Sequence, residues 1–248
     1  MTDVKGKWAL ITGASRGIGY LAAKFMAERG CNLVLHSRTE EHSAKILGEV
    51  KALGVDAYAI AADLADPAQV TNMLKEIDAK NTPIEIVLNN AGVQVAYRTE
   101  FYETPISDFT TSFQVNTIAP AMICYHYMPK MVERGFGRIV NTTSGIQLDP
   151  QQAGYSASKA ALDKFTIDIG TKVQGTDVMI NLADPGWCRT DLGGQSAPNP
   201  PEAALPGVIT GVFVNDKKSG RCFAAGNFMG MTIEQAVAHA ESNLNSPY

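Results

Sequence analysis

Short apolar runs alternate with longer amphipathic stretches along the chain. The apolar runs predict buried strands, and hydrophobic residues spaced three and four positions apart predict helices between them. This alternation is typical of βαβ units around a parallel sheet, so the pattern predicts an α/β fold. The predicted strands are Trp8–Ile11, Asn32–Leu35, Asp56–Ala61, Ile84–Leu88, Gly137–Asn141, Val178–Ala183 and Arg221–Ala225. The predicted helices are Ile18–Arg29, Glu40–Leu53, Pro67–Lys80, Ser107–Arg134, Tyr155–Val173 and Pro201–Val214.

The rest of the pattern favours a single domain. A last helix is predicted at Ile233–Leu244, where Thr232 and Gln235 stand in the register of a capping box. No repeat or shift in composition marks a linker, and the Pro- and Gly-rich stretch Gly193–Pro201 is too short to be a hinge between domains. We therefore interpret residues 1–248 as one domain.

Composition narrows the range of partners. The chain has 21 Lys and Arg against 25 Asp and Glu, a formal charge of −4, and no block of basic residues. Because nucleic acids and anionic membranes bind clustered cations, neither is predicted as a main partner. A small-molecule partner is expected instead.

The cysteines and the N-terminal residues give no signal for a metal site or for export. Cys31, Cys124, Cys188 and Cys222 are scattered without a CxxC pair, and no histidine stands at ligand spacing, so buried free thiols and no metal are predicted. The N-terminal residues lack the apolar stretch of a secretion signal, and no run approaches about 18 apolar residues. These patterns predict a cytoplasmic protein without a membrane span.

A glycine-rich segment directly follows the first predicted strand and leads into a helix. Gly13 permits a sharp turn, Gly17 lets backbone N–H groups approach a pyrophosphate, and Gly19 lets the helix pack closely on the strand. A tight strand-to-helix connection is the alternative interpretation. On the first interpretation, the candidate dinucleotide-binding residues are Gly13, Ser15, Arg16, Gly17, Ile18 and Gly19.

The residues after the second strand favour NADP(H) over NAD. Many NAD-binding proteins place a carboxylate here to hold the adenosine ribose, but this chain has Ser37 and Arg38, and its first acid is Glu40. Together with Arg16, these residues can hold a 2′-phosphate, because a guanidinium matches its geometry and charge. The alternative is that Arg38 is a solvated side chain.

Two more strand ends carry candidate cofactor contacts. After the third strand, Asp63 can accept a hydrogen bond from an adenine amino group while Leu64 covers the ring. Alternatively, Asp63 belongs to a turn before a helix that is capped by Asp66 and begins at Pro67. The fourth strand ends in small and polar residues that let a cofactor lie against the backbone, unless they form a plain turn. The candidates there are Asn90, Ala91 and Gly92.

Ser144, Tyr155 and Lys159 give the strongest chemical signal. A spacing of four residues places the phenol and the ammonium on one helical face. Lowering the pKa of a phenol from near 10 to about 7 requires roughly 4 kcal/mol, and a cation about 4 Å away supplies that order of magnitude at an effective dielectric of about 20. Ser144 can then hydrogen-bond a substrate oxygen while Tyr155 exchanges its proton and Lys159 also holds the nicotinamide ribose. The alternative is chance, since such Tyr–Lys spacing is common on helices.

From Lys7 to about Ala225 the chain resembles the short-chain dehydrogenase/reductase family. The motifs that match in order and approximate spacing are Thr12–Gly19, Asn89–Gly92, Asn116, Ser144, Tyr155, Lys159 and Pro185-Gly186. The resemblance implies a doubly wound (Rossmann) fold, a seven-stranded parallel sheet flanked by helices on both faces. It also implies a catalytic tetrad of Asn116, Ser144, Tyr155 and Lys159, in which the asparagine bends its helix and holds a water that links the lysine to solvent.

The segment after the sixth predicted strand resembles the family's nicotinamide-binding loop. The matching residues are Pro185, Gly186, Cys188 and Thr190, with the backbone at Cys188 expected to contact the amide, although a plain Pro-Gly turn is the alternative. Beyond Asp191 the chain lacks the long two-helix lid of many members and resembles the carbonyl-reductase-like branch, which implies an open, mostly apolar pocket. The candidate substrate contacts are Gln94, Tyr97, Ile146, Trp187 and Leu192.

The predicted activity is the NADP(H)-dependent, reversible interconversion of a carbonyl compound and an alcohol, with Tyr155 as general acid and base. A ketone, an aldehyde or a quinone is the expected substrate. The alternatives are a protein that senses NADP(H) without turnover, and a dehydrogenase that oxidises a sugar acid or a steroid. The C-terminal extension, from about residue 226 to residue 248, is longer than is usual in the family and either caps the sheet or reaches a neighbouring subunit, which leaves a homodimer or homotetramer open.

Overall fold

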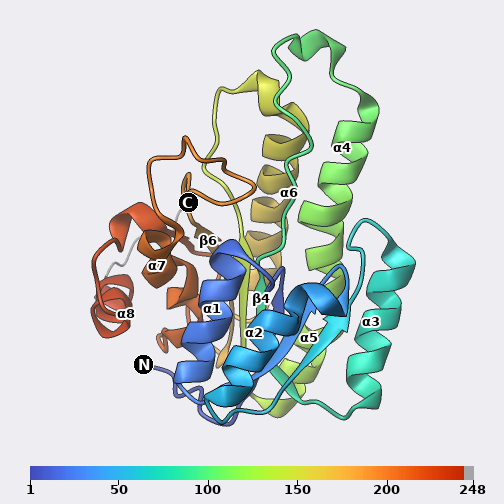
Figure 1. Ribbon diagram of the computed structural model, residues 1–248. Coiled ribbons are helices and arrows are strands. Elements are labelled where there is room, and N and C mark those ends of the chain that lie inside the picture. Colours follow the sequence, from blue (N-terminus) through green and yellow to red (C-terminus); the bar gives the residue numbers. More distant parts are fainter. Residues whose placement is uncertain (243–248) are drawn as a thin grey trace.

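A parallel sheet forms the centre of the molecule. The computed structural model describes residues 1–242, and seven strands in this range form one parallel sheet in the order β3-β2-β1-β4-β5-β6-β7 (Figure 1). The chain winds outward from β1 to β3, returns to β4 and continues the other way, which confirms the predicted doubly wound fold. Ligands of such sheets bind beyond the carboxyl ends of the strands, where the winding direction changes. The strands are β1 (Trp8–Thr12), β2 (Asn32–Ser37), β3 (Ala57–Ala61), β4 (Ile84–Asn89), β5 (Gly137–Thr142), β6 (Val178–Asp184) and β7 (Cys222–Ala224).

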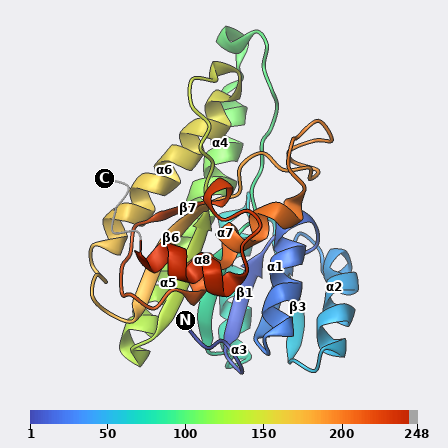
Figure 2. The same cartoon turned by 90° about the vertical axis from the view of Figure 1, so that its left-hand side faces the viewer.

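Helices cover both faces of the sheet, and each face has its own apolar core. Successive strand residues point to opposite faces. In β1, Ile11 belongs to the core beneath α1, α2, α7 and α8, whereas Leu10 belongs to the core beneath α3, α5 and α6. Figures 1 and 2 show α4 beside α6, projecting beyond the rest of the molecule. The helices are α1 (Gly17–Glu28), α2 (Glu40–Ala52), α3 (Pro67–Ala79), α4 (Ile106–Phe113), α5 (Ala119–Arg134), α6 (Ala153–Gly170), α7 (Pro201–Phe213) and α8 (Ile233–Ser242).

Several boundaries differ from the sequence prediction by one or more residues. The helix predicted at Ser107–Arg134 is divided into α4 and α5 by a π-helical segment, Gln114–Ile118. The helix predicted from Tyr155 begins earlier, at Ala153, and ends at Gly170. The last strand is shorter than predicted, and the backbone N–H of Arg221, which precedes it, donates to the Asn181 side chain at 3.0 Å.

The described part of the C-terminal extension packs against the rest of the same chain. Its helix α8 packs on α7, and Ala236, Val237 and Ala240 are buried in the core that α1 shares. The predicted capping box is confirmed, since the backbone N–H groups of Thr232 and Gln235 donate to each other's side chains at 2.9 and 3.3 Å. The end of the predicted helix, residues 243 and 244, lies outside the described residues.

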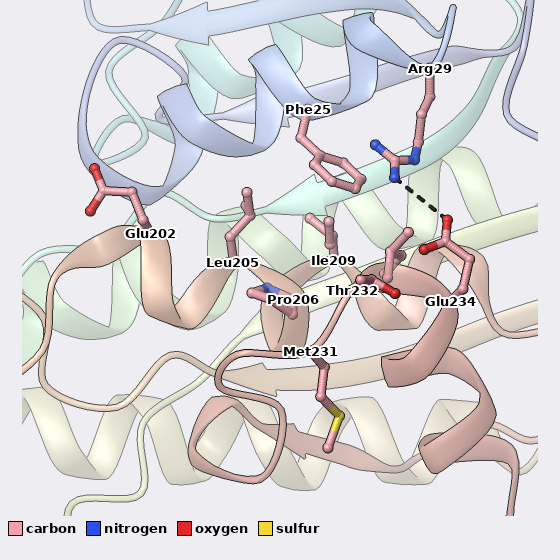
Figure 3. Close-up of a pocket in the computed structure, with 10 residues that line it drawn as sticks. Phe25, Arg29, Glu202, Leu205, Pro206, Ile209, Met231, Thr232 and Glu234 are labelled. Carbon is pink, nitrogen blue, oxygen red and sulfur yellow. Dashed lines mark ion pairs between the residues drawn. The ribbon is translucent and has the colours of Figure 1, made fainter.

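A cavity of about 270 Å³ lies between α1, α7 and the turn before α8 (Figure 3). Phe25, Leu205 and Ile209 form part of its apolar wall. At its edge the Arg29 guanidinium forms an ion pair with the Glu234 carboxylate at an N–O distance of 3.8 Å. None of the predicted site residues lines this cavity. It is therefore separate from the candidate active site.

The cysteines follow the prediction with one exception. Cys31, Cys124 and Cys188 are buried free thiols, but Cys222 is exposed, because it lies on the edge strand β7. In residues 1–242, no three His, Cys, Asp or Glu side chains are grouped as metal ligands would be. No helix in the same range has the length and the apolar character needed to cross a bilayer.

Candidate active site

The glycine-rich segment makes a tight turn between β1 and α1. Gly13 and Gly17 have φ values of +66° and +56°, in the left-handed region that glycine adopts without steric cost. A Cβ atom at Gly19 would lie 2.2 Å from the Gly13 carbonyl oxygen, so only glycine permits this close packing. The first turn of α1 has neither a side-chain cap nor an acidic residue, which leaves its backbone N–H groups for an anion. Ser15 and Ile18 are half-buried in the same turn.

Polar contacts join this turn to the end of β4. The Asn90 side-chain amide donates to the Thr12 carbonyl oxygen at 3.1 Å, and the Ala91 N–H donates to the Thr12 hydroxyl at 3.0 Å. The winding direction changes between β1 and β4, so these residues lie where doubly wound sheets bind their ligands.

His36 also supports the glycine turn, and sequence reasoning did not single it out. The Gly13 N–H donates to His36 Nδ1 at 3.4 Å, and His36 Nε2 lies 3.0 Å from the Ala62 carbonyl oxygen. These contacts require a neutral ring that carries its proton on Nε2. Burial lowers the pKa of His36 to about 4, against the opposing effects of the Ala62 hydrogen bond and the Asp63 charge. The signal in the sequence that could have identified it is a histidine within an otherwise apolar strand.

Acid is expected to destabilise the fold through His36. Below about pH 6.5 this histidine is protonated in the unfolded chain, whereas in the folded protein it stays neutral until about pH 4. The free energy of unfolding therefore decreases as pH falls across this window, by up to roughly 3 kcal/mol. His36→Asn keeps an acceptor for the Gly13 N–H and is expected to flatten this dependence. Urea unfolding at pH 7 and pH 5 measures it, with the exposed His42→Asn as control. Equal pH dependence in both variants would contradict the assignment.

The candidate 2′-phosphate residues differ in their contacts. Arg38 is exposed, and in residues 1–242 its guanidinium forms no ion pair. Arg16 pairs with Asp191 at 2.6 Å, which ties the glycine turn to the loop after β6. The Ser37 hydroxyl is buried and donates to the Thr39 carbonyl oxygen at 2.6 Å, so its contacts are internal. Arg38 is therefore the most available of the three for a phosphate.

After β3, the contacts favour the turn interpretation of Asp63. Its Oδ1 accepts the Ala65 N–H at 2.9 Å, and Leu64 is buried in the core beneath α3. The predicted cap is confirmed, because Asp66 accepts the N–H groups of Ala68 and Gln69 and Pro67 begins the helix. The adenine contacts predicted for Asp63 and Leu64 stay predictions.

Asn116 lies in the π-helical segment between α4 and α5 and is fully buried. Its amide exchanges two 2.8 Å hydrogen bonds with the backbone of Val93, and it donates to the Ser158 hydroxyl at 3.0 Å. A Cβ atom at Gly92 would lie 3.4 Å from Asn116 Oδ1 and 3.5 Å from Lys159 Nζ. Asn116 thus joins the segment after β4 to α6 beside the lysine.

Ser144 and Tyr155 meet above the end of β5. Burial raises the pKa of the Tyr155 phenol, a hydrogen bond with the Ser144 side chain lowers it, and the Asp184 carboxylate raises it. The net direction is upward, so this phenol is protonated at neutral pH. This direction is opposite to the net lowering that the sequence spacing predicted.

Lys159 explains this difference. Its ammonium is buried, donates to the Thr142 carbonyl oxygen at 2.6 Å and lies 6.0 Å from the centre of the Tyr155 ring. Burial lowers the pKa of Lys159 to about 8, while the Asp163 and Asp184 carboxylates act in the opposite direction. The two side chains share a helical face as predicted, but the ammonium is held by backbone.

The loop after β6 is a series of tight turns. The Cys188 thiol donates to the Pro185 carbonyl oxygen at 3.3 Å, and the Thr190 N–H donates to the Cys188 carbonyl oxygen at 2.8 Å. The Thr190 methyl group lies 3.3 Å from where a Cβ atom at Gly17 would be, and Gly186 has a φ of +67°. The predicted nicotinamide loop therefore lies against the glycine turn.

The candidate substrate residues do not line the small hollow that lies beside Tyr155. This hollow is lined from the segment after β4, from α4 and from the start of α6. Trp187 is exposed and its indole N–H donates to the Gly193 carbonyl oxygen at 2.7 Å. The others are exposed (Tyr97 and Leu192) or half-buried (Gln94 and Ile146).

Comparisons with known proteins agree with this geometry. A family model described as short chain dehydrogenase matches residues 7–200. A short-chain type dehydrogenase/reductase of Picea abies is 34% identical over 197 residues, covering 75% of this chain and 72% of that protein. The ketoacyl reductase HetN of Nostoc sp. is 33% identical over 189 residues, covering 75% of this chain and 65% of that protein.

A solved structure extends the likeness to three dimensions. The crystal structure of 3-oxoacyl (acyl-carrier-protein) reductase from Agrobacterium tumefaciens C58 with NADP bound has a TM-score of 0.73 and 26% sequence identity. The match covers 96% of this chain and 90% of that one. The chain described here therefore belongs to the short chain dehydrogenase family, which is a family of oxidoreductases.

Proposed function

We propose that the chain is an NADP(H)-dependent oxidoreductase that reversibly interconverts a carbonyl compound and an alcohol. The observation that carries the proposal is the meeting of the Ser144 and Tyr155 hydroxyls one helical turn from a buried ammonium, at the carboxyl edge of the sheet. Few reactions require a protonated phenol, a hydroxyl and a buried cation beside a dinucleotide-type turn. The cytoplasmic location, the oligomeric state and the carbonyl-reductase-like branch stay predictions.

The residues present fit a dinucleotide. The uncapped first turn of α1 supplies N–H groups for the pyrophosphate, and Arg38 supplies an exposed guanidinium for a 2′-phosphate. No acidic residue follows β2 before Glu40 to repel that phosphate. The Agrobacterium relative was crystallised with NADP, which supports the same assignment here. When bound, this coenzyme supplies or accepts the hydride.

Proton transfer falls to Tyr155. For carbonyl reduction, the hydroxyl that gives up a proton must be protonated beforehand, and the raised pKa of Tyr155 meets this requirement. Ser144 hydrogen-bonds the phenol and is available to the same substrate oxygen. In the oxidising direction Tyr155 must lose its proton first, so alkaline pH favours that direction.

Lys159 and Asn116 support the phenol in different ways. The Lys159 ammonium adds positive charge near the developing phenolate and is placed to hold a ribose hydroxyl. Asn116 acts as a positioning residue, because its amide joins the Val93 backbone to the hydroxyl of Ser158, the residue before Lys159. The water relay that the family resemblance implies for Asn116 stays a prediction.

An activity panel tests the proposed function. The protein is incubated with NADPH and a series of ketones, aldehydes and quinones, and the loss of NADPH absorbance is followed. The exposed candidate substrate residues Tyr97, Trp187 and Leu192 are uncharged and therefore favour neutral substrates over polyanions. Turnover of at least one neutral carbonyl compound is expected. NADPH binding without turnover of any of them would count against the proposed reaction.

Arg38→Leu is expected to lower the preference for NADPH over NADH by about 10- to 100-fold, the effect of losing one charge-assisted hydrogen bond to a phosphate. The measurement is the ratio of kcat/KM for the two coenzymes. Arg16→Leu is the matched comparison, with a smaller effect, because Arg16 is already paired with Asp191. An unchanged ratio in Arg38→Leu would mean that Arg38 is only a solvated side chain.

A further inference from the structure

The carboxylate of Asp184 lies beside the reacting groups and takes no part in the mechanism described so far. Asp184 is the last residue of β6, and its Oδ1 accepts the Gly186 N–H at 2.9 Å. Its Oδ2 faces Gly145, where a Cβ atom would lie 2.7 Å away. Because Gly145 directly follows Ser144, the absence of a side chain at Gly145 is what lets the carboxylate approach the catalytic segment.

The charge of Asp184 is not neutralised by a neighbour. Among the described residues the carboxylate forms no ion pair, and it accepts its hydrogen bond from the backbone N–H of Gly186. It raises the pKa of Tyr155 and of Lys159, so its field reaches both catalytic side chains. The other titratable groups that its charge reaches are Asp163 on α6, Cys188 on the following loop and Cys222 on β7.

The next step rests on the proposed function. The oxidised form of a nicotinamide coenzyme carries a positive charge on the ring, and the reduced form does not. The ring must meet the substrate at the Tyr155 hydroxyl, so a charge that acts on this hydroxyl also acts on the ring. We propose that Asp184 is a specificity-determining residue that favours binding of the oxidised over the reduced coenzyme.

The size of the effect follows from one charge pair several ångströms apart in a partly buried site. Such a pair changes the relative affinity of the two coenzyme forms by about tenfold, equivalent to about 1.4 kcal/mol. The hydride and the proton are still exchanged between coenzyme, substrate and Tyr155, so the proposal adds no reactant. It changes only the relative affinity of the site for the two coenzyme forms.

Asp184→Asn tests the proposal, because the amide keeps an acceptor for the Gly186 N–H and removes the charge. NADPH affinity is measured by fluorescence titration and NADP⁺ affinity by competition. The Kd for NADP⁺ is expected to rise about tenfold and the Kd for NADPH to change by less than about twofold. Glu133→Gln removes the same charge from the exposed end of α5 and is expected to leave both values unchanged.

Gly145→Ala is a second variant that keeps the charge but displaces it, since the new Cβ cannot lie 2.7 Å from Asp184 Oδ2. It is expected to move the affinity ratio in the same direction, and it decides the question alone if Asp184→Asn fails to fold. In Asp184→Asn the pH needed for alcohol oxidation is also expected to fall, because the carboxylate no longer raises the pKa of Tyr155.

Three results would overturn the proposal. Equal weakening of both coenzyme forms in Asp184→Asn would assign the residue a structural role. An unchanged affinity ratio in both variants would show that the charge does not reach the ring. A wild-type protein that binds neither form would overturn the proposed function and this inference with it, whereas normal binding with an unchanged ratio overturns the inference alone.

Discussion

Replacing Tyr155 by phenylalanine is expected to lower kcat for carbonyl reduction by about 10²- to 10⁴-fold, the usual contribution of a positioned general acid. Phenylalanine keeps the buried ring and removes only the hydroxyl, whose hydrogen-bond partner is Ser144. Coenzyme affinity and thermal stability are expected to stay close to those of the wild type. Steady-state kinetics, NADPH titration and thermal unfolding measure the three quantities.

The control for this variant is Tyr125→Phe, which removes an exposed hydroxyl on α5. Its kcat is expected to match the wild type. If Tyr155→Phe kept kcat within about tenfold of the wild type, the proton would have to come from another group. If it lost NADPH affinity as well, the phenol would be a binding group rather than the acid.

Lys159→Met is expected to lower kcat by about 10²-fold or more and also to weaken NADPH binding. Methionine has a similar volume but no charge, so it removes the cation near the phenolate and leaves the Thr142 carbonyl oxygen without its donor. The activity of the wild type in carbonyl reduction is expected to fall as pH rises through about 8, where the Lys159 ammonium loses its proton. This decline is expected to be missing in Lys159→Met.

Lys164→Met is the matched control on the same helix, because Lys164 is exposed and pairs with the exposed Asp168. It is expected to change neither kcat nor coenzyme affinity. A Lys159→Met protein that lost stability but kept its NADPH affinity and its alkaline pH profile would show that the buried ammonium is a structural group alone.

The sheet and its order could be predicted because their signals are local and repeated. Each strand is a short apolar run, and the alternation with helices leaves few topologies open. The caps at helix N-termini could also be predicted, because Asp66, Pro67 and Thr232 act on residues only a few positions away. The π-helical segment that divides α4 from α5 was not predicted from the hydrophobic spacing, which continues through Gln114–Ile118. A bend at Asn116 was expected only from the family resemblance.

Contacts between distant segments were the part that the sequence could not supply. Helical spacing correctly placed Tyr155 and Lys159 on one face, but it contains no information about the Thr142 carbonyl that holds the ammonium away from the phenol. The Arg16–Asp191 pair joins residues 175 positions apart. Burial was the other missing quantity, since it reverses the predicted direction of the Tyr155 pKa and keeps His36 neutral.

The central claim is that Tyr155 delivers a proton to a substrate oxygen beside a bound nicotinamide. A crystal structure of the protein with NADP⁺ and an unreactive carbonyl analogue tests it most directly. The account predicts the Tyr155 hydroxyl oxygen within about 2.6–3.2 Å of the analogue's oxygen, with Ser144 also in contact. A Tyr155 hydroxyl that points away from the nicotinamide, with another side chain bonded to the analogue's oxygen, would contradict it.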